Sequence, residues 1–143
     1  MQRILVATDG SEGAGRAVDA AARLAAALHA ELWIVNVMDQ LTGEELNRIT
    51  QVEKSSVGDV LDAISGQILL KAKERSQSLG VPIIHLKSRS GDSAQAILEI
   101  ARAINADAVF AGKRGRGRLA GVLLGSVSQK LASLAPCMVV IVP

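Results

Sequence analysis

Five short apolar runs, separated by longer segments with helical periodicity, constrain the fold of this chain more than any other feature. The runs cover residues 4–7, 32–38, 83–86, 108–111 and 138–142. Most of them are continuous rather than alternating, which is typical of parallel strands buried on both faces. A chain of 143 residues is long enough for one domain with a substantial core. We therefore expect residues 1–143 to form a single domain.

The segments between the runs predict helices. Apolar residues recur at three- and four-residue steps from Ala17 to Leu28, from Val60 to Leu79 and from Ala94 to Ile104, and a fourth helix is expected over about residues 127–135. Residues 39–58 are polar and predict a long loop. Strands that alternate with helices predict a doubly wound α/β domain with a parallel sheet and right-handed crossovers.

Two helix starts carry the spacing of a capping box. Asp92 is followed three residues later by Gln95, and Ser126 is followed three residues later by Gln129. In this motif the first side chain accepts a hydrogen bond from a backbone amide of the first turn. Pro136 then closes the last helix.

Composition excludes several classes of protein. The formal net charge of +2 does not indicate a general polyanion binder, and one Trp, one Phe and no Tyr offer few rings for stacking nucleic-acid bases. The single cysteine, Cys137, cannot form an internal disulfide; with no signal peptide in evidence, we expect a cytoplasmic protein. No apolar run approaches the ~20 residues that span a bilayer.

The first apolar run leads into the turn Thr8-Asp9-Gly10-Ser11. Ligands of open α/β sheets bind outside the carboxyl ends of the strands, and Asp9 stands at such an end. Its carboxylate would accept hydrogen bonds from ribose hydroxyls or help to hold a metal ion. The alternative is that Asp9 forms an Asx turn or caps the next helix. The turn has neither the dinucleotide fingerprint nor the Walker A pattern.

A glycine-rich basic loop follows the fourth apolar run. Gly112, Gly115 and Gly125 are separated by two and nine residues, and four of the six residues 113–118 are Lys or Arg. Glycines let a ligand approach the backbone, and basic side chains donate hydrogen bonds to anions. A strand, such a loop and a helix start in this order predict a phosphate-binding site.

The start of the last helix completes this prediction. Amides at residues 126–128 favour an anion, and the hydroxyls of Ser126 and Ser128 are expected to contact phosphate oxygens directly. Two alternatives remain open: a solvated basic loop with Ser126 only as a helix cap, or a loop whose Arg114, Arg116 and Arg118 contact a nucleic-acid backbone.

These residues resemble the universal stress protein family. The opening strand and turn are similar to those of the family, and the pattern Gly112-x2-Gly115-x9-Gly125-Ser126 is similar to the motif of its ATP-binding branch. The resemblance implies a five-stranded parallel sheet in the order 3-2-1-4-5, an architecture like that of the adenine-nucleotide α-hydrolases. It also implies a switch point between the first and fourth strands, at Asp9 and Gly112.

The resemblance further implies a binding site for ATP, ADP or AMP. The acid at Asp9 would lie near the ribose, the backbone at Val37 near the adenine, and the glycine motif around the phosphates. The candidate residues are Ala7, Thr8, Asp9, Ser11, Val37, Ala111, Gly112, Arg114, Gly115, Arg116, Gly125, Ser126, Val127 and Ser128. Mg²⁺ or Mn²⁺ would accompany the phosphates, although its ligands are not identified.

No residue is assigned a catalytic role. Hydrolysis needs a positioned water and usually a base or an electrophile beside the γ-phosphate. We expect His29 and His85 to lie away from the phosphates, and Cys137 to pack as a small apolar residue. The leading hypothesis is a nucleotide-dependent stress-response switch with slow or no ATP hydrolysis. The alternatives are a nucleotide-independent dimeric interaction protein of the same fold and a true kinase or ATPase.

The last apolar run is expected at a sheet edge, where a long apolar strand favours pairing with another chain. The family resemblance implies a homodimer through this strand by antiparallel pairing. The pairing residues would be Met138, Val139, Val140, Ile141 and Val142. The alternative is an edge that Pro143 alone protects.

Overall fold

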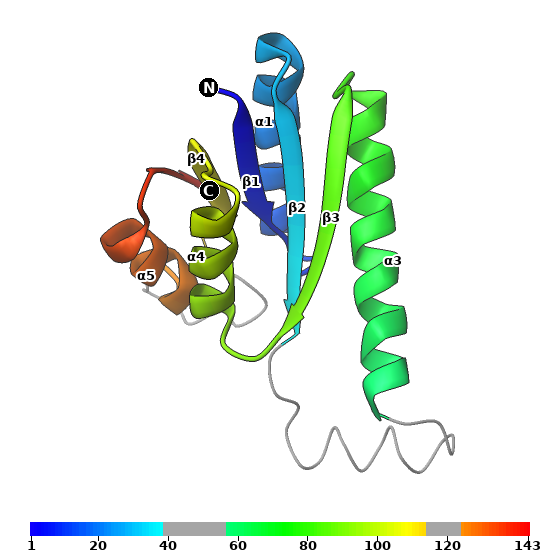
Figure 1. Ribbon diagram of the computed structural model, residues 1–143. Coiled ribbons are helices and arrows are strands. Elements are labelled where there is room, and N and C mark those ends of the chain that lie inside the picture. Colours follow the sequence, from blue (N-terminus) through cyan, green and yellow to red (C-terminus); the bar gives the residue numbers. More distant parts are fainter. Residues whose placement is uncertain (39–56, 114–123) are drawn as a thin grey trace.

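The computed structural model describes residues 1–38, 57–113 and 124–143. They form a five-stranded sheet in the order β3-β2-β1-β4-β5, with every neighbouring pair parallel (Figure 1). The strands are β1 (Arg3–Ala7), β2 (Glu31–Met38), β3 (Ile83–Ser90), β4 (Ala108–Gly112) and β5 (Met138–Val142). The predicted doubly wound α/β fold and the strand order are confirmed.

Helices cover both faces of the sheet. Helices α1 (Glu12–Leu28) and α3 (Val57–Ser78) lie on one face, and α4 (Ser93–Ala103) and α5 (Ser126–Leu134) lie on the other (Figure 1). Consecutive strand residues point to opposite faces. Ile4 and Val6 therefore pack in the core under α1, whereas Leu5 packs with Ile97 and Leu131 under α4 and α5.

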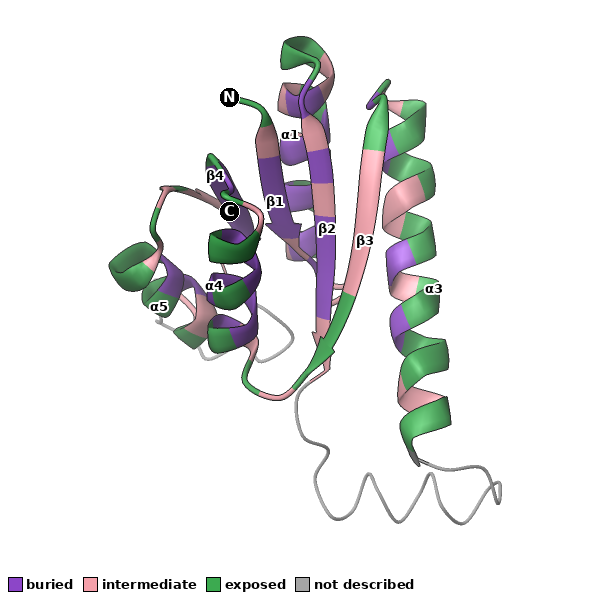
Figure 2. Cartoon of the chain, in the orientation of Figure 1, coloured by how far each residue is buried: buried purple, intermediate pink, exposed green. Residues whose placement is uncertain are grey.

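The inner strands are more deeply buried than the edge strands (Figure 2). In β1, Ile4, Leu5 and Val6 are all fully buried, whereas β5 is half-buried or exposed throughout. Burial on both faces, as predicted, holds for the inner strands and fails for the two edges. Strand β3 also runs four residues beyond the predicted run, because its polar second half continues the pairing with β2 as far as Met38–Ser90.

Helix starts agree with the sequence in one case and differ in another. Asp92 caps α4, and its Oδ2 accepts a hydrogen bond from the Gln95 amide at 2.9 Å, as predicted. The prediction that Ser126 caps α5 is wrong. The N-cap is Gly125, which makes no side-chain cap bond, and Ser126 is already the first helical residue.

The predicted loop 39–58 lies mostly outside the described residues. Its last two positions belong to α3, which begins at Val57 and so earlier than the apolar periodicity indicated. Within the described ranges, no helix combines the length and the apolar character needed to cross a membrane.

Candidate functional site

The candidate site lies where β1 and β4 end side by side. The two strands pair in parallel from Ile4–Ala108 to Val6–Phe110. Beyond this point the chain turns from β1 toward β2 on one side and continues from β4 toward β5 on the other. Such a reversal of strand order leaves a crevice at the carboxyl ends of the strands. The structure thus places the Asp9 turn and the end of β4 together, at the end of the sheet where the parallel strands terminate.

The turn after β1 is held by its own side chains. The Ser11 amide donates a hydrogen bond to Asp9 Oδ1 at 2.9 Å, and the Gly10 amide donates to Thr8 Oγ1 at 3.2 Å. Ser11 then caps α1 by accepting a hydrogen bond from the Ala14 amide. Asp9 therefore forms the Asx turn that the sequence left as an alternative. Asp9 is only half-buried.

Gly10 gives this turn its shape. Its φ of +83° lies in the left-handed region, where residues with a side chain are strained. A Cβ atom at this position would also lie 3.2 Å from Cγ1 of Ile68 on α3. The turn is thus packed between the end of β1 and α3.

Gly112 is required by packing between α1 and β4. A Cβ atom at Gly112 would lie 3.1 Å from both the carbon and the oxygen of the Gly13 carbonyl, and 3.2 Å from the Ala14 nitrogen. Backbone atoms cannot give way as a flexible side chain can. The first glycine of the motif therefore lets the first turn of α1 approach the end of β4, which brings the two halves of the site together.

Ser128 links the end of β4 to α5. Its side chain is buried, and its hydroxyl donates to the Gly112 carbonyl oxygen at 2.7 Å and, at 3.2 Å, to that of Lys113. The expectation was that this hydroxyl contacts phosphate. In the structure this hydroxyl holds the end of β4 to α5, whereas the amide of Ser128 belongs to the first turn of α5.

The N-terminus of α5 presents an anion-binding arrangement of amides. The Gly125 amide donates to the Lys113 carbonyl oxygen at 2.9 Å, and the first bond within the helix runs from the Gln129 amide to Gly125. The amides of residues 126–128 precede that bond and so have no partner within the helix. Together with the helix dipole, they favour a negatively charged group at this end.

The remaining predicted residues divide into two groups. Ala7, Thr8, Val37 and Ala111 lie at or next to the carboxyl ends of β1, β2 and β4. Arg114, Gly115 and Arg116 lie outside the described residues.

A metal ion at this place would depend on the nucleotide for most of its ligands. Among the residues that the structure describes, no group of three or more His, Cys, Asp or Glu side chains could hold a metal. The half-buried carboxylate of Asp9 can supply one oxygen, and Mg²⁺ commonly takes the rest from phosphates and water. The donor set therefore fits Mg²⁺ or Mn²⁺ only in company with a bound phosphate.

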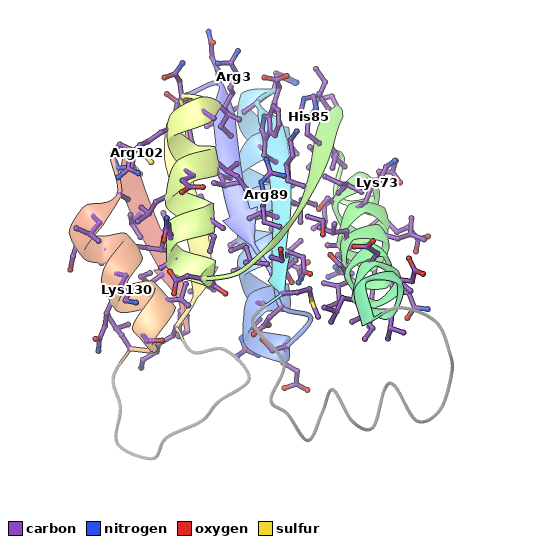
Figure 3. All side chains as sticks on the ribbon, turned by 60° about the horizontal axis from the view of Figure 1, so that its bottom comes forward. Arg3, Lys73, His85, Arg89, Arg102 and Lys130 are labelled. Atoms are coloured by element: carbon purple, nitrogen blue, oxygen red, sulfur yellow. The ribbon has the colours of Figure 1, made fainter. Side chains whose placement is uncertain are left out.

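The two histidines and the cysteine lie elsewhere. His29 ends α1 as its C-cap, and His85 stacks on Trp33 with ring centroids 4.1 Å apart. Figure 3 shows His85 and Arg3 near the amino ends of the strands. Asp9 instead follows the carboxyl end of β1. Burial and, secondarily, the nearby carboxylate of Asp107 raise the pKa of the Cys137 thiol, which disfavours the nucleophilic thiolate.

One buried polar residue of this region was missed in the sequence. Asn36 on β2 is 1% exposed, and its side-chain amide donates to the Thr8 carbonyl oxygen at 2.8 Å. The available signal was a lone amide side chain inside the apolar run 32–38.

Comparisons with known proteins agree with the fold of this chain. The universal stress protein family matches residues 1–143. Universal stress protein YxiE of Bacillus subtilis is 33% identical over 145 residues, which cover 98% of this chain and 97% of that protein.

Solved structures give the same relationship. A universal stress protein crystallised in complex with cAMP is 30% identical, with a TM-score of 0.77 over 99% of this chain and 97% of the other. UspA from Lactobacillus plantarum has a TM-score of 0.80 at 22% identity, over 99% and 97% of the two chains. At that identity the likeness concerns the fold alone.

Proposed function

The chain belongs to the universal stress protein family, and on that premise we propose that it binds an adenine nucleotide, in the first place ATP. The bound nucleotide would switch the protein between two states in a stress response. Hydrolysis would be slow or absent, because the proposed site residues position the nucleotide and none of them acts as a base.

The observation that carries the proposal is the approach of α1 to the end of β4 at Gly112. The contact of Gly112 with Gly13 sets the Asp9 turn beside the end of β4, where the Lys113 carbonyl oxygen accepts a hydrogen bond from the Gly125 amide at the start of α5. A carboxylate and a set of helix amides on one crevice fit the two ends of a nucleotide, since ribose hydroxyls donate to carboxylates and phosphates accept from amides. The relative crystallised with cAMP supports an adenine nucleotide as the ligand.

Each group of residues has a role in this proposal. Asp9 accepts hydrogen bonds from the ribose, Ala7 and the backbone of Val37 border the adenine, and the amides of residues 126–128 bind the phosphates. Gly115, Arg114 and Arg116 join the phosphate site on the strength of the motif Gly-x2-Gly-x9-Gly-Ser. Mg²⁺ or Mn²⁺, if bound with ATP, would offset the phosphate charge beside Asp9.

The expected affinity follows from the number of charged hydrogen bonds. Each hydrogen bond to a phosphate contributes roughly 1.5–3 kcal/mol. Three or four of them reach about 8 kcal/mol, which corresponds to a micromolar Kd.

Cyclic AMP is the second candidate ligand, because the relative at 30% identity was crystallised with it. It has the same adenine, but only the 2′-hydroxyl of its ribose is free, and its one phosphate carries a single negative charge. A site that depends on the α5 amides and the basic loop should favour ATP over cAMP. A site that depends on contacts with the adenine and the 2′-hydroxyl should bind the two about equally.

The proposal is tested by calorimetric titration with ATP, ADP, AMP and cAMP, with and without Mg²⁺. The variant Gly115→Val with Ser126→Ala should lose at least about tenfold in affinity for ATP, since it crowds the loop and removes a hydroxyl at the α5 N-terminus. Ser133→Ala, exposed in the last turn of the same helix, is the matched control and should bind as the wild type does. Unchanged affinity in the double variant would contradict the assignment of the site.

A further inference from the structure

Asn36 is a buried side chain that the nucleotide contacts proposed above do not use. It stands on β2 in a run of apolar residues, and it is 1% exposed. Its Oδ1 is buried without a hydrogen-bond partner among the described residues. A buried polar atom of this kind costs stability. We therefore expect the NH₂ group at the other end of the amide to make a contact that offsets this loss of stability.

That other end holds Thr8. The Asn36 Nδ2 atom lies 2.8 Å from the Thr8 carbonyl oxygen. Because a carbonyl oxygen only accepts hydrogen bonds, the NH₂ group of Asn36 must face it, which fixes the orientation of the amide. The pairing of β1 with β2 ends at Ala7–Val35. The Asn36 side chain thus bonds β2 to Thr8, the first residue after β1.

Thr8 also fixes the backbone that leads into the Asp9 turn. Its amide donates to the Val35 carbonyl oxygen at 2.9 Å, and its hydroxyl accepts from the Gly10 amide at 3.2 Å. With Asn36, the amide, carbonyl and hydroxyl of Thr8 are all engaged. A residue with all three polar groups fixed gives the following carboxylate a defined position.

Asn36 supports the turn from the face of the sheet that α1 and α3 cover. Strand residues alternate between faces, and Ile34 on the same strand packs in the core under α1 and α3. Asn36 therefore faces that side, whereas Val37 packs with the core on the other. Its register neighbour Ser88 is bonded to Ser65 of α3, with the two Oγ atoms 2.8 Å apart. The side chain thus supports the turn without standing in the crevice.

We infer that Asn36 is a positioning residue, which sets the place of Asp9 through the Thr8 carbonyl and thereby contributes to nucleotide affinity. This inference rests on the proposed function. It predicts that loss of the Asn36 donor lowers affinity by about tenfold, the effect of one buried hydrogen bond.

The test is the pH profile of Asn36→Asp. A deprotonated aspartate cannot donate to the Thr8 carbonyl, whereas a protonated one can. Burial raises the pKa of such a carboxyl group well above its ordinary value. The ratio of the ATP affinity of Asn36→Asp to that of the wild type should be near one at about pH 5 and fall about tenfold by about pH 8. Taking the ratio at each pH cancels the titration of ATP itself.

A matched control separates positioning from general destabilisation. Ser76 on α3 is fully buried, and its hydroxyl donates to the Ala72 carbonyl oxygen at 2.8 Å. Ser76→Ala should lower the free energy of unfolding and leave the affinity ratio at one throughout the pH range. Asn36→Leu, which lacks the donor at every pH, serves if the aspartate variant does not fold.

A second readout does not need a ligand. Amide hydrogen exchange at Gly10 and Ser11 should be faster by about tenfold in Asn36→Leu than in the wild type, and unchanged in Ser76→Ala. A wild type that binds no nucleotide would contradict the proposed function, yet the exchange rates would still decide whether Asn36 holds the turn. Unchanged exchange, or faster exchange with unchanged affinity, would overturn the inference.

Discussion

Individual glycine and serine residues of the motif have structural roles that do not depend on ligand binding. Gly112 admits the backbone of Gly13, and the Ser128 hydroxyl holds the carbonyls of Gly112 and Lys113. Both residues would be needed for this packing at the end of β4 even without a nucleotide. A loss of binding after mutation at either position therefore does not identify a contact with the ligand.

Gly112→Ala should destabilise the protein by about 1–3 kcal/mol, because the added methyl group meets backbone atoms that cannot move aside. The measurement is the free energy of unfolding from chemical denaturation. Gly66→Ala is the control, since this glycine lies in α3 with no atom within 4 Å of its added Cβ. That change should stabilise the protein by roughly 0.5–1 kcal/mol. Equal stability of Gly112→Ala and the wild type would refute the packing argument.

Helix ends show where the sequence predicts local structure and where it does not. Two Ser/Asp-x-x-Gln patterns were equivalent in the sequence, yet only Asp92 is an N-cap. At α5 the Gly125 amide bonds to the Lys113 carbonyl oxygen, which fixes the entry of the chain one residue before Ser126. A contact with another element decided the cap, and no pattern within the helix contains that information.

An ion pair between α1 and α3 should make stability depend on pH on the acid side. Arg75 Nε lies 2.9 Å from Asp19 Oδ1, and this hydrogen bond, with the guanidinium charge, holds the pKa of Asp19 below its ordinary value. A lowered folded-state pKa stabilises the protein above the ordinary pKa of about 4, and the contribution is lost as the pH falls below it.

Asp19→Asn should therefore reduce the loss of stability between about pH 5 and about pH 2. The effect is small, as for other partly exposed pairs, and is measured by denaturation at several pH values. Arg75→Met should flatten the same part of the curve, and the double variant should add nothing further. Additive effects of the two changes would show that the pair is not the cause.

At the scale of the whole molecule, the sequence predicted the fold better than it predicted individual contacts. The order of apolar runs and helical stripes predicted the α/β class, because each element reveals its own period. The place of Asp9 and Gly112 at one edge followed from the rule for parallel sheets. The contact between Gly13 and Gly112 and the bond between Asn36 and Thr8 could not be predicted, because each joins elements far apart in the chain.

Assembly is a further property of the whole molecule, and we propose a homodimer through β5. The strand is at the edge of the sheet, and Met138 is 57% exposed. The Val142 carbonyl accepts from the Lys113 amide at 2.7 Å and so faces β4. In a parallel strand the backbone groups of alternate residues face opposite sides, so those of Ile141 face outward.

Ile141→Pro should consequently give a monomer, because it removes an outward amide and leaves the groups that bond to β4 in place. The mass in solution, measured by light scattering, decides the matter. Ile141→Val keeps the amide and should remain a dimer. A wild-type protein that is monomeric at high concentration would contradict the proposed assembly.

The most direct test of nucleotide binding is a titration of the ¹⁵N-labelled protein with ATP, followed by the amide resonances in NMR spectra. If the nucleotide lies in the crevice between β1 and β4, the resonances of residues 9–11 and 126–128 will shift together and saturate at one common micromolar Kd. Shifts confined to other parts of the chain, or none at millimolar ATP, would contradict the proposed site.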